Sequence, residues 1–231
     1  MRIALLVAVS ALVAGCSGGA GGPADGTGSP SATGTSSATT PTPTSSRTTT
    51  PSPAASGSPR PGAAIADVIG WIEAATPADV AGYHAMTRGG EKTDLGDDVA
   101  FTTAGAETNC VTNRHRDGAL ACLVKLADPP ARPAGIETAW KPNWVDFTGP
   151  TVDVGSPHGD PGPFRDGTGA ELPVGRSLAF GDYRCRADAA GLFCVDYAHQ
   201  TAVALSARGV VPFGCLQKAA PPADIGLRFS C

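Results

Sequence analysis

The spacing of apolar residues predicts a helix at the start of the folded region. Four apolar side chains recur at the spacing of one helical face: Ile65, Val68, Ile69 and Ile72. They predict an amphipathic helix over Ala63–Ala75, with this face turned to a core. Thr76-Pro77 would end it, because proline cannot continue a helix. A second short helix is predicted over Pro77–Met86, with Thr76 as its N-cap.

After Asp97 the pattern changes to short runs typical of β-strands. The clearest pair is Asn109–Thr112 and Leu120–Val124, which flank a turn at Asp117-Gly118. Asp-Gly between two apolar runs indicates a hairpin, since both residues tolerate positive φ. Alternate residues of its second half are predicted to face inward: Leu120, Cys122, Val124 and Leu126.

A second hairpin is predicted from Asp182–Cys185 and Leu192–Val195, with a turn between Asp188 and Gly191. Further strands are predicted at Val99–Thr102, Trp144–Phe147, Thr151–Val154, Ala202–Ser206 and Ile225–Cys231. Among these, Ala202–Ser206 is compatible with helix or strand, and its alternation favours strand. The predicted fold is mainly β with an N-terminal helix, a small α+β domain. It is antiparallel, with two disulfide-linked hairpins packed on each other in a compact sandwich or barrel-like core.

The segment Gly155–Gly169 is predicted to be a long irregular loop, because glycine and proline interrupt it repeatedly. Long loops without regular structure are often functional. It is therefore the first place in the chain to look for a ligand surface.

The first 15 residues have the pattern of an export signal. Met1-Arg2 carries one positive charge, and Ile3–Ala14 is apolar apart from Ser10. About a dozen apolar residues suit a secretory leader and are too few to span a bilayer. No second long apolar run follows in the sequence.

Val13-Ala14-Gly15-Cys16, at the end of this run, resembles the bacterial lipobox. The resemblance implies cleavage before Cys16 and a diacylglyceryl group on its sulfur, with palmitate among the acyl chains. Two acyl chains give stable attachment, whereas a single chain binds membranes only marginally. The expected location is the outer face of the cell membrane, with the membrane as partner through the lipid.

The chain has seven cysteines, and assigning Cys16 to lipid leaves an even set. The remaining six are Cys110, Cys122, Cys185, Cys194, Cys215 and Cys231. In an oxidising compartment an even set indicates disulfides, although six cysteines allow 15 pairings. The first predicted hairpin favours a Cys110–Cys122 bridge. The second predicted hairpin brings Cys185 and Cys194 together, and Cys215–Cys231 then follows by elimination.

Between the lipid site and the folded region, residues 16–62 form a predicted tether. Serine, threonine and proline make up 24 of the 31 residues of Ser29–Pro59, without Leu, Ile, Val or Phe. Such a segment cannot bury enough apolar surface to offset the entropy of ordering, so disorder is predicted. The organisation is therefore a leader (1–15), a lipidated tether (16–62) and one extracytoplasmic domain (63–231).

Three segments of the domain resemble mycobacterial and other actinobacterial LppI-type lipoproteins: Ala179–Cys185, Gly191–Cys194 and Pro212–Cys215. The resemblance extends from Ile65 to Cys231 and includes the lipobox. It implies an envelope lipoprotein without an assigned reaction. It carries over Cys16 as the lipid site and no catalytic residue.

The sequence contains few motifs that indicate catalysis or metal binding. The four histidines, His84, His115, His158 and His199, form no His-Glu-x-x-His motif, and no Gly-x-Ser-x-Gly or phosphate-binding glycine loop occurs. His158 with Asp160 could contribute to a metal or hydrolytic site, and His199 has Asp196 nearby. A net charge of −4 without a basic cluster argues against nucleic acid.

The sequence therefore favours a non-enzymatic binding or structural domain whose ligand is a protein, glycan or lipid. No catalytic residue, cofactor or metal-ligand set is assigned. The alternative is a cell-envelope hydrolase with a site near the Gly155–Gly169 loop, using His158 and Asp160.

Overall fold

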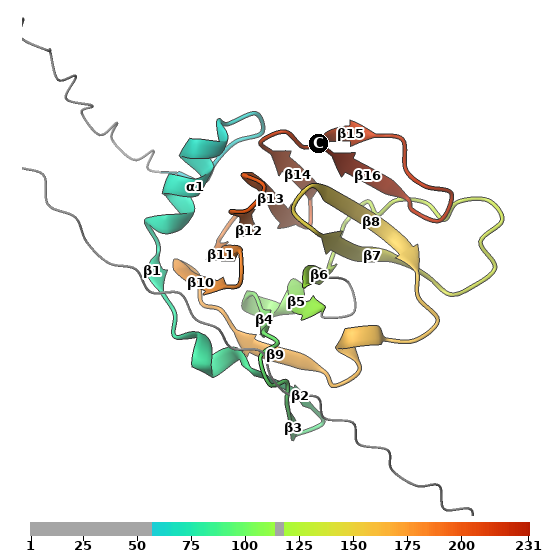
Figure 1. Ribbon diagram of the computed structural model, residues 1–231. Helices are drawn as coiled ribbons and strands as arrows, with labels where there is room; N and C mark the ends of the chain where they lie inside the picture. Colours follow the sequence, from blue (N-terminus) through green and yellow to red (C-terminus); the bar gives the residue numbers. More distant parts are fainter. Residues whose placement is uncertain (1–56, 114–117) are drawn as a thin grey trace, which may run out of the picture. The chain divides into compact units, whose positions relative to one another are not determined.

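Two β-sheets make up most of the folded region (Figure 1). The computed structural model describes residues 57–113 and 118–231, so the leader, Cys16 and the tether up to residue 56 lie outside the described residues. Strands account for 46% and helices for 11%, and neither sheet closes into a barrel in the described part of the chain. The prediction of a mainly β fold with one N-terminal helix is confirmed.

The six-stranded sheet is made of consecutive antiparallel strands with a short parallel strand at one edge. Its order is β1 (Thr76–Pro77), β10 (Arg176–Phe180), β11 (Tyr183–Asp188), β12 (Gly191–Asp196), β13 (Thr201–Ser206) and β14 (Gly209–Phe213). The second hairpin and the predicted strand at Ala202–Ser206 lie at its centre.

The ten-stranded sheet joins segments from both ends of the domain. Its order is β15 (Gln217–Ala219), β16 (Leu227–Ser230), β8 (Thr151–Pro157), β7 (Trp140–Phe147), β6 (Ala119–Val124), β5 (Thr108–Asn113), β4 (Ala100–Thr102), β9 (Thr168–Glu171), β2 (Ala85–Arg88) and β3 (Glu91–Asp94). All neighbours are antiparallel except β4 and β9, so the antiparallel prediction holds for nearly the whole fold.

The main core lies between the two sheets, as predicted for a sandwich. Inward side chains of both hairpins meet in it, including Leu120, Val124 and Leu192, all with no exposed surface. The Tyr183 hydroxyl donates to the backbone oxygen of Phe147 at 3.0 Å and so ties one sheet to the other. The two hairpins therefore pack on each other across the sandwich.

Three disulfides link the six cysteines in the predicted pairs. Cys110–Cys122 joins directly opposed residues of β5 and β6, and Cys185–Cys194 does the same in β11 and β12. Both are buried in the main core. Cys215–Cys231 is exposed and fastens the C-terminal residue to the segment after β14.

The helix α1 (Ile65–Glu73) covers the outer face of the six-stranded sheet. Trp71 packs edge-on against Phe193 of β12, with ring centroids 4.9 Å apart, and Val68 and Ile72 are fully buried. The guanidinium of Arg186 lies 3.6 Å from the Trp71 ring centroid. No helix within residues 57–113 and 118–231 has the length and apolar character to cross a bilayer.

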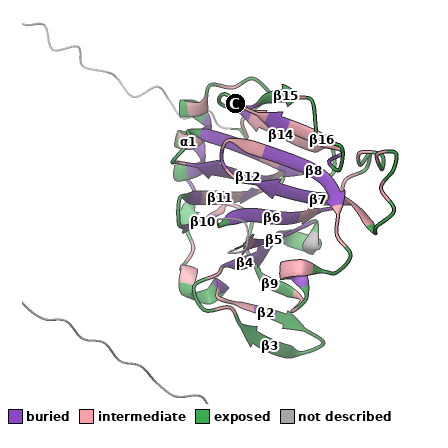
Figure 2. Ribbon diagram, turned by 45° about the vertical axis from the view of Figure 1, so that its right-hand side comes forward, coloured by how far each residue is buried: buried purple, intermediate pink, exposed green. Residues whose placement is uncertain are grey.

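A third apolar cluster occupies the outer face of the ten-stranded sheet. Its buried members are Met86, Ala100, Val111, Ala121, Trp144 and Phe164. Both faces of β6 are therefore buried, as the purple strand in Figure 2 shows, which explains its nearly continuous apolar sequence.

Two local predictions are wrong. Pro77–Met86 is not a second helix: Thr76 and Pro77 pair with β10, and only Val80–Tyr83 form a 3₁₀ helix, η1, capped by Asp79. The Gly155–Gly169 loop is shorter than expected, because β8 continues to Pro157 and β9 begins at Thr168. Between them lies the short 3₁₀ helix η4 (Gly162–Phe164). In both places strand pairing with a distant segment overrides the local signal.

Candidate functional site

A cleft of about 1030 Å³ opens on the outer face of the ten-stranded sheet. One wall is the β2–β3 hairpin and the other is the segment between β8 and β9, residues 158–167, called here the η4 loop. Val111, Thr112 and Trp144 form the floor. The η4 loop belongs to the segment that the sequence predicted as a ligand surface, whereas the hairpin wall and the floor come from segments that the sequence did not connect with it.

The β2–β3 hairpin is sharp because Gly89 and Gly90 both take positive φ, at 59° and 90°. A two-residue turn with two such values matches the twist of the paired strands. It pairs Arg88 with Glu91 and Met86 with Thr93. Since residues two apart share a face, Glu91 and Thr93 lie on the side of Met86 and line the cleft.

The η4 loop is held to the sheet by its own backbone. The Arg88 guanidinium donates to the backbone oxygen of Arg165 at 2.9 Å, and Asp160 accepts from the Gly162 N–H at 2.8 Å. Gly167 has φ of 108°, and a Cβ there would stand 2.1 Å from the Thr87 carbonyl oxygen. The loop is therefore a fixed wall of the cleft rather than a loose flap.

His158 stacks on the buried indole of Trp144, with ring centroids 3.6 Å apart and planes at 18°. Phe164 meets the same indole edge-on at 5.0 Å, and the indole N–H donates to Asp146 at 3.0 Å. Trp144 is only 2% exposed, so its ring supports the floor and the half-buried His158 presents the aromatic surface.

His158 also forms a hydrogen bond that the sequence did not predict. Its Nε2 lies 2.9 Å from the hydroxyl oxygen of Ser156. The spacing Ser-x-His at the end of a strand was the available signal, because residues two apart in extended backbone point to the same face. Ser156 is 5% exposed and is not among the residues that line the cleft, so this hydrogen bond holds His158 from a buried position.

The predicted partner of His158, Asp160, also lines the cleft, but one of its oxygens caps Gly162. Across residues 57–113 and 118–231, no group of three or more His, Cys, Asp or Glu side chains could hold a metal ion.

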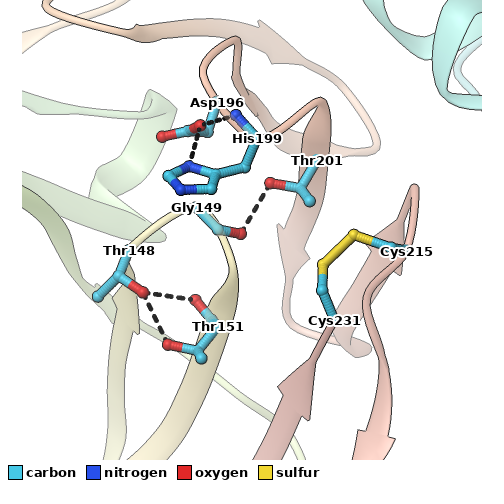
Figure 3. Close-up of a disulfide and its surroundings, with 8 residues drawn as sticks. All are labelled: Thr148, Gly149, Thr151, Asp196, His199, Thr201, Cys215 and Cys231. Atoms are coloured by element: carbon cyan, nitrogen blue, oxygen red, sulfur yellow. Dashed lines mark hydrogen bonds and ion pairs between the residues drawn. A yellow bond between two sulfur atoms is a disulfide. The ribbon is translucent and has the colours of Figure 1, made fainter.

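The structure brings Asp196 and His199 together at another place (Figure 3). His199 Nδ1 lies 2.9 Å from Asp196 Oδ1, and the same oxygen accepts the His199 backbone N–H at 2.8 Å. A Cβ on Gly149 would stand 2.3 Å from His199 Nδ1, and Thr201 donates to the Gly149 carbonyl at 2.8 Å. The Asp196–His199 bonds therefore lie within the β12–β13 turn, which packs closely on Gly149 and is joined to the β7–β8 turn by the Thr201 hydrogen bond.

Of the other two histidines, His84 is not among the residues that line the cleft. His84 Nδ1 lies 3.0 Å from the backbone oxygen of Asp98, which joins the residue after η1 to the turn that leads into β4. His115, and Asp117 of the first hairpin turn, lie outside the described residues.

A smaller hollow of about 340 Å³ lies between the ends of the two sheets. Small side chains such as Ala104, Ala190 and Ala207 line it, and the half-exposed Val174 stands at its edge. It has fewer charged groups than the large cleft, whose size falls at the upper end of the range for ligand sites. The large cleft is the better candidate.

Comparison with known proteins gives no functional role to any residue of this chain. No protein-family model, curated protein or solved structure matches the chain. The function is therefore inferred from the geometry of its own residues, and the resemblance to LppI-type lipoproteins stays a prediction.

Proposed function

We propose that the protein is a lipid-anchored lipoprotein of the cell envelope whose domain binds a ligand in the cleft without transforming it. The observation that carries the binding role is the open cleft of about 1030 Å³ between two fixed walls. Three disulfides support a place outside the cytoplasm, where such bonds persist. Anchoring through Cys16 and membership of the LppI-type family belong to the same proposal.

Binding in the cleft is tested by photo-cross-linking in intact cells. A photoreactive residue replaces the exposed Arg165 at the cleft or, as a control, the exposed Glu137 outside it. A specific adduct is expected at the first position alone. It should disappear when Thr93→Trp fills the cleft from the opposite wall. Equal adducts at both positions, or none at position 165, contradict the binding role.

The anchor is tested separately by labelling with palmitate. The wild-type chain should incorporate the label and sediment with membranes, and Cys16→Ser should do neither, because no other site carries acyl chains. Unchanged incorporation in Cys16→Ser rules out Cys16 as the lipid site.

A hydrolase is the second candidate, and the Ser156–His158 hydrogen bond of 2.9 Å favours it. In a Ser-His arrangement the imidazole removes the hydroxyl proton as the serine attacks a carbonyl. The 5% exposure of Ser156 weighs against this chemistry, since a nucleophile must reach its substrate. A fluorophosphonate probe distinguishes the two: labelling that Ser156→Ala abolishes would establish the hydrolase.

A further inference from the structure

We propose that the cleft binds a neutral, extended oligosaccharide. This inference rests on the proposed binding role of the cleft and names its ligand class. Three features carry it: opposite charges placed side by side on each wall, a row of polar side chains on the cleft side of β3, and apolar surface next to them.

Two of the four carboxylates that line the cleft serve the fold. Asp98 accepts a hydrogen bond from the Thr112 hydroxyl at 2.8 Å, and Asp160 accepts one from the backbone of the η4 loop at 2.8 Å. The other two carboxylates, those of Glu91 and Asp166, each have a guanidinium group as neighbour. The lining therefore offers a ligand no clear surplus of either charge, which favours a neutral ligand over an ionic one.

Each wall of the cleft carries one guanidinium group beside one carboxylate. On the hairpin wall, Arg88 and Glu91 are directly opposite residues of β2 and β3. On the η4 loop, Arg165 Nε lies 3.9 Å from Asp166 Oδ1. Arg88 also donates to the backbone oxygen of Arg165, which uses one of the several N–H groups of its guanidinium. Both walls therefore present N–H donors next to carboxylate acceptors.

This arrangement of donors and acceptors matches the hydroxyl groups of a sugar. A hydroxyl both donates and accepts hydrogen bonds, and neighbouring hydroxyls project side by side from the ring, so adjacent guanidinium and carboxylate groups can bond to both. All four residues of β3 are exposed, as the green strand in Figure 2 shows. Glu91 and Thr93 face the cleft about 7 Å apart along this strand, a spacing comparable with the length of one sugar ring and its hydroxyls.

Apolar side chains lie next to these polar groups. Leu95 follows on the hairpin side, Val111 lies in the floor, and Pro163 belongs to the opposite wall. The faces of a sugar ring consist of C–H groups, which pack on apolar surface while the hydroxyls at the ring edge bond to polar side chains. Such a mixture is typical of ligand sites, where a few polar groups fix the orientation. The volume of about 1030 Å³ exceeds that of one sugar ring, so the ligand is an oligosaccharide.

The test uses the full-length protein in micelles of a detergent without a sugar headgroup. The probes are fluorescent linear hexasaccharides of glucose, N-acetylglucosamine, mannose or galactose. Fluorescence anisotropy should show saturable binding of at least one of them, and raising the salt concentration should change Kd by less than about twofold, because a neutral ligand has no charge to screen. Binding of none of the four, or binding that weakens strongly with salt, overturns the inference.

Matched variants place the oligosaccharide in the cleft. Glu91→Leu and Thr93→Val should each raise Kd about 3- to 10-fold, since each removes hydrogen bonds to the ligand. Glu91→Gln keeps an acceptor oxygen and should stay within about twofold of wild type. Glu137→Leu, at an exposed site outside the cleft, should leave Kd unchanged. Equal effects of Glu91→Leu and Glu137→Leu, or of Glu91→Leu and Glu91→Gln, contradict the proposed contacts.

The adduct formed at position 165 in intact cells separates this inference from the binding role. An oligosaccharide adduct should lose its added mass after treatment with periodate, which cleaves the vicinal diols of sugars and leaves peptide bonds intact. A cleft-specific adduct that periodate leaves unchanged, as a peptide or lipid would, refutes the oligosaccharide and leaves the binding role standing. Absence of any adduct at position 165 contradicts the binding role itself.

Discussion

Tyr183 shows how a single residue joins the two sheets. Its hydroxyl donates to the Phe147 backbone oxygen, and its ring packs against Phe147 and Phe180. Burial raises the pKa of the Tyr183 phenol well above its ordinary value, and the nearby negative charge of Asp196 adds to the increase. The phenol therefore stays neutral in the folded protein at pH values where it ionises in the unfolded chain.

This difference predicts a loss of stability in alkali. Because the folded pKa is raised, the contribution of Tyr183 is complete below the unfolded pKa of about 10 and is lost as the pH rises above it. Tyr183→Phe should cost about 1–2 kcal/mol at pH 7, from the lost hydrogen bond. Its unfolding free energy should then fall less than that of wild type between pH 9 and pH 11, as urea denaturation would measure.

The matched control is Tyr197→Phe. Burial also raises the pKa of Tyr197, but this phenol is only partly buried and bonds to Glu73 at the surface of α1. It should keep most of the wild-type pH dependence. If Tyr183→Phe loses stability in alkali as steeply as wild type, Tyr183 is not the group responsible.

Among the elements, the η4 loop decides the shape of the cleft. Its end lies so close to β2 that Gly167 leaves no space for a side chain beside the Thr87 carbonyl. The opposite wall, β3, has no buried residue and is held by its tight turn and its pairing with β2. One wall is therefore fixed by packing and the other by backbone pairing.

Gly167→Ala is predicted to destabilise the protein by about 2–4 kcal/mol, because it adds a backbone clash to an unfavourable φ. Gly159→Ala, in the same loop with no atom within 4 Å of the new Cβ, should change the unfolding free energy by less than about 0.5 kcal/mol. Urea denaturation followed by tryptophan fluorescence measures both. Similar values for the two variants would show that the loop is not held at Gly167.

At the scale of the whole molecule, the three disulfides divide into two kinds. The four cysteines of the hairpins are at most 1% exposed inside the sandwich. Cys215 and Cys231 are exposed and join the end of the six-stranded sheet to the edge of the ten-stranded one. A thiolate must reach a sulfur atom to break a disulfide. A reductant therefore reaches the exposed Cys215–Cys231 bond much more easily than the two buried bonds.

Mild reduction of the native protein is therefore predicted to open Cys215–Cys231 first. Alkylation and mass mapping should find label on these two residues while the four buried cysteines stay protected. The double variant Cys215→Ser/Cys231→Ser should lose about 3 kcal/mol, because a loop of about 15 residues is no longer closed in the unfolded chain. Simultaneous labelling of all six cysteines would contradict this order.

The sequence by itself determined the parts of the fold that depend on neighbours along the chain. Each disulfide-linked hairpin needs alternate apolar residues and a short turn between its halves, and both are local. The helix at Ile65–Glu73 follows from its apolar stripe in the same way. The six cysteines paired as predicted because two pairs lie within hairpins and the third was what remained.

Tertiary structure decided the rest. β3 and β9 lack an apolar alternation, and β14 contains Pro212, which an edge strand tolerates, so their pairing depends on distant strands. The cleft combines Glu91, Val111 and His158, which the sheet order brings together from three separate parts of the sequence. Local patterns specify turns and faces, but which faces meet depends on long-range packing that no single segment encodes.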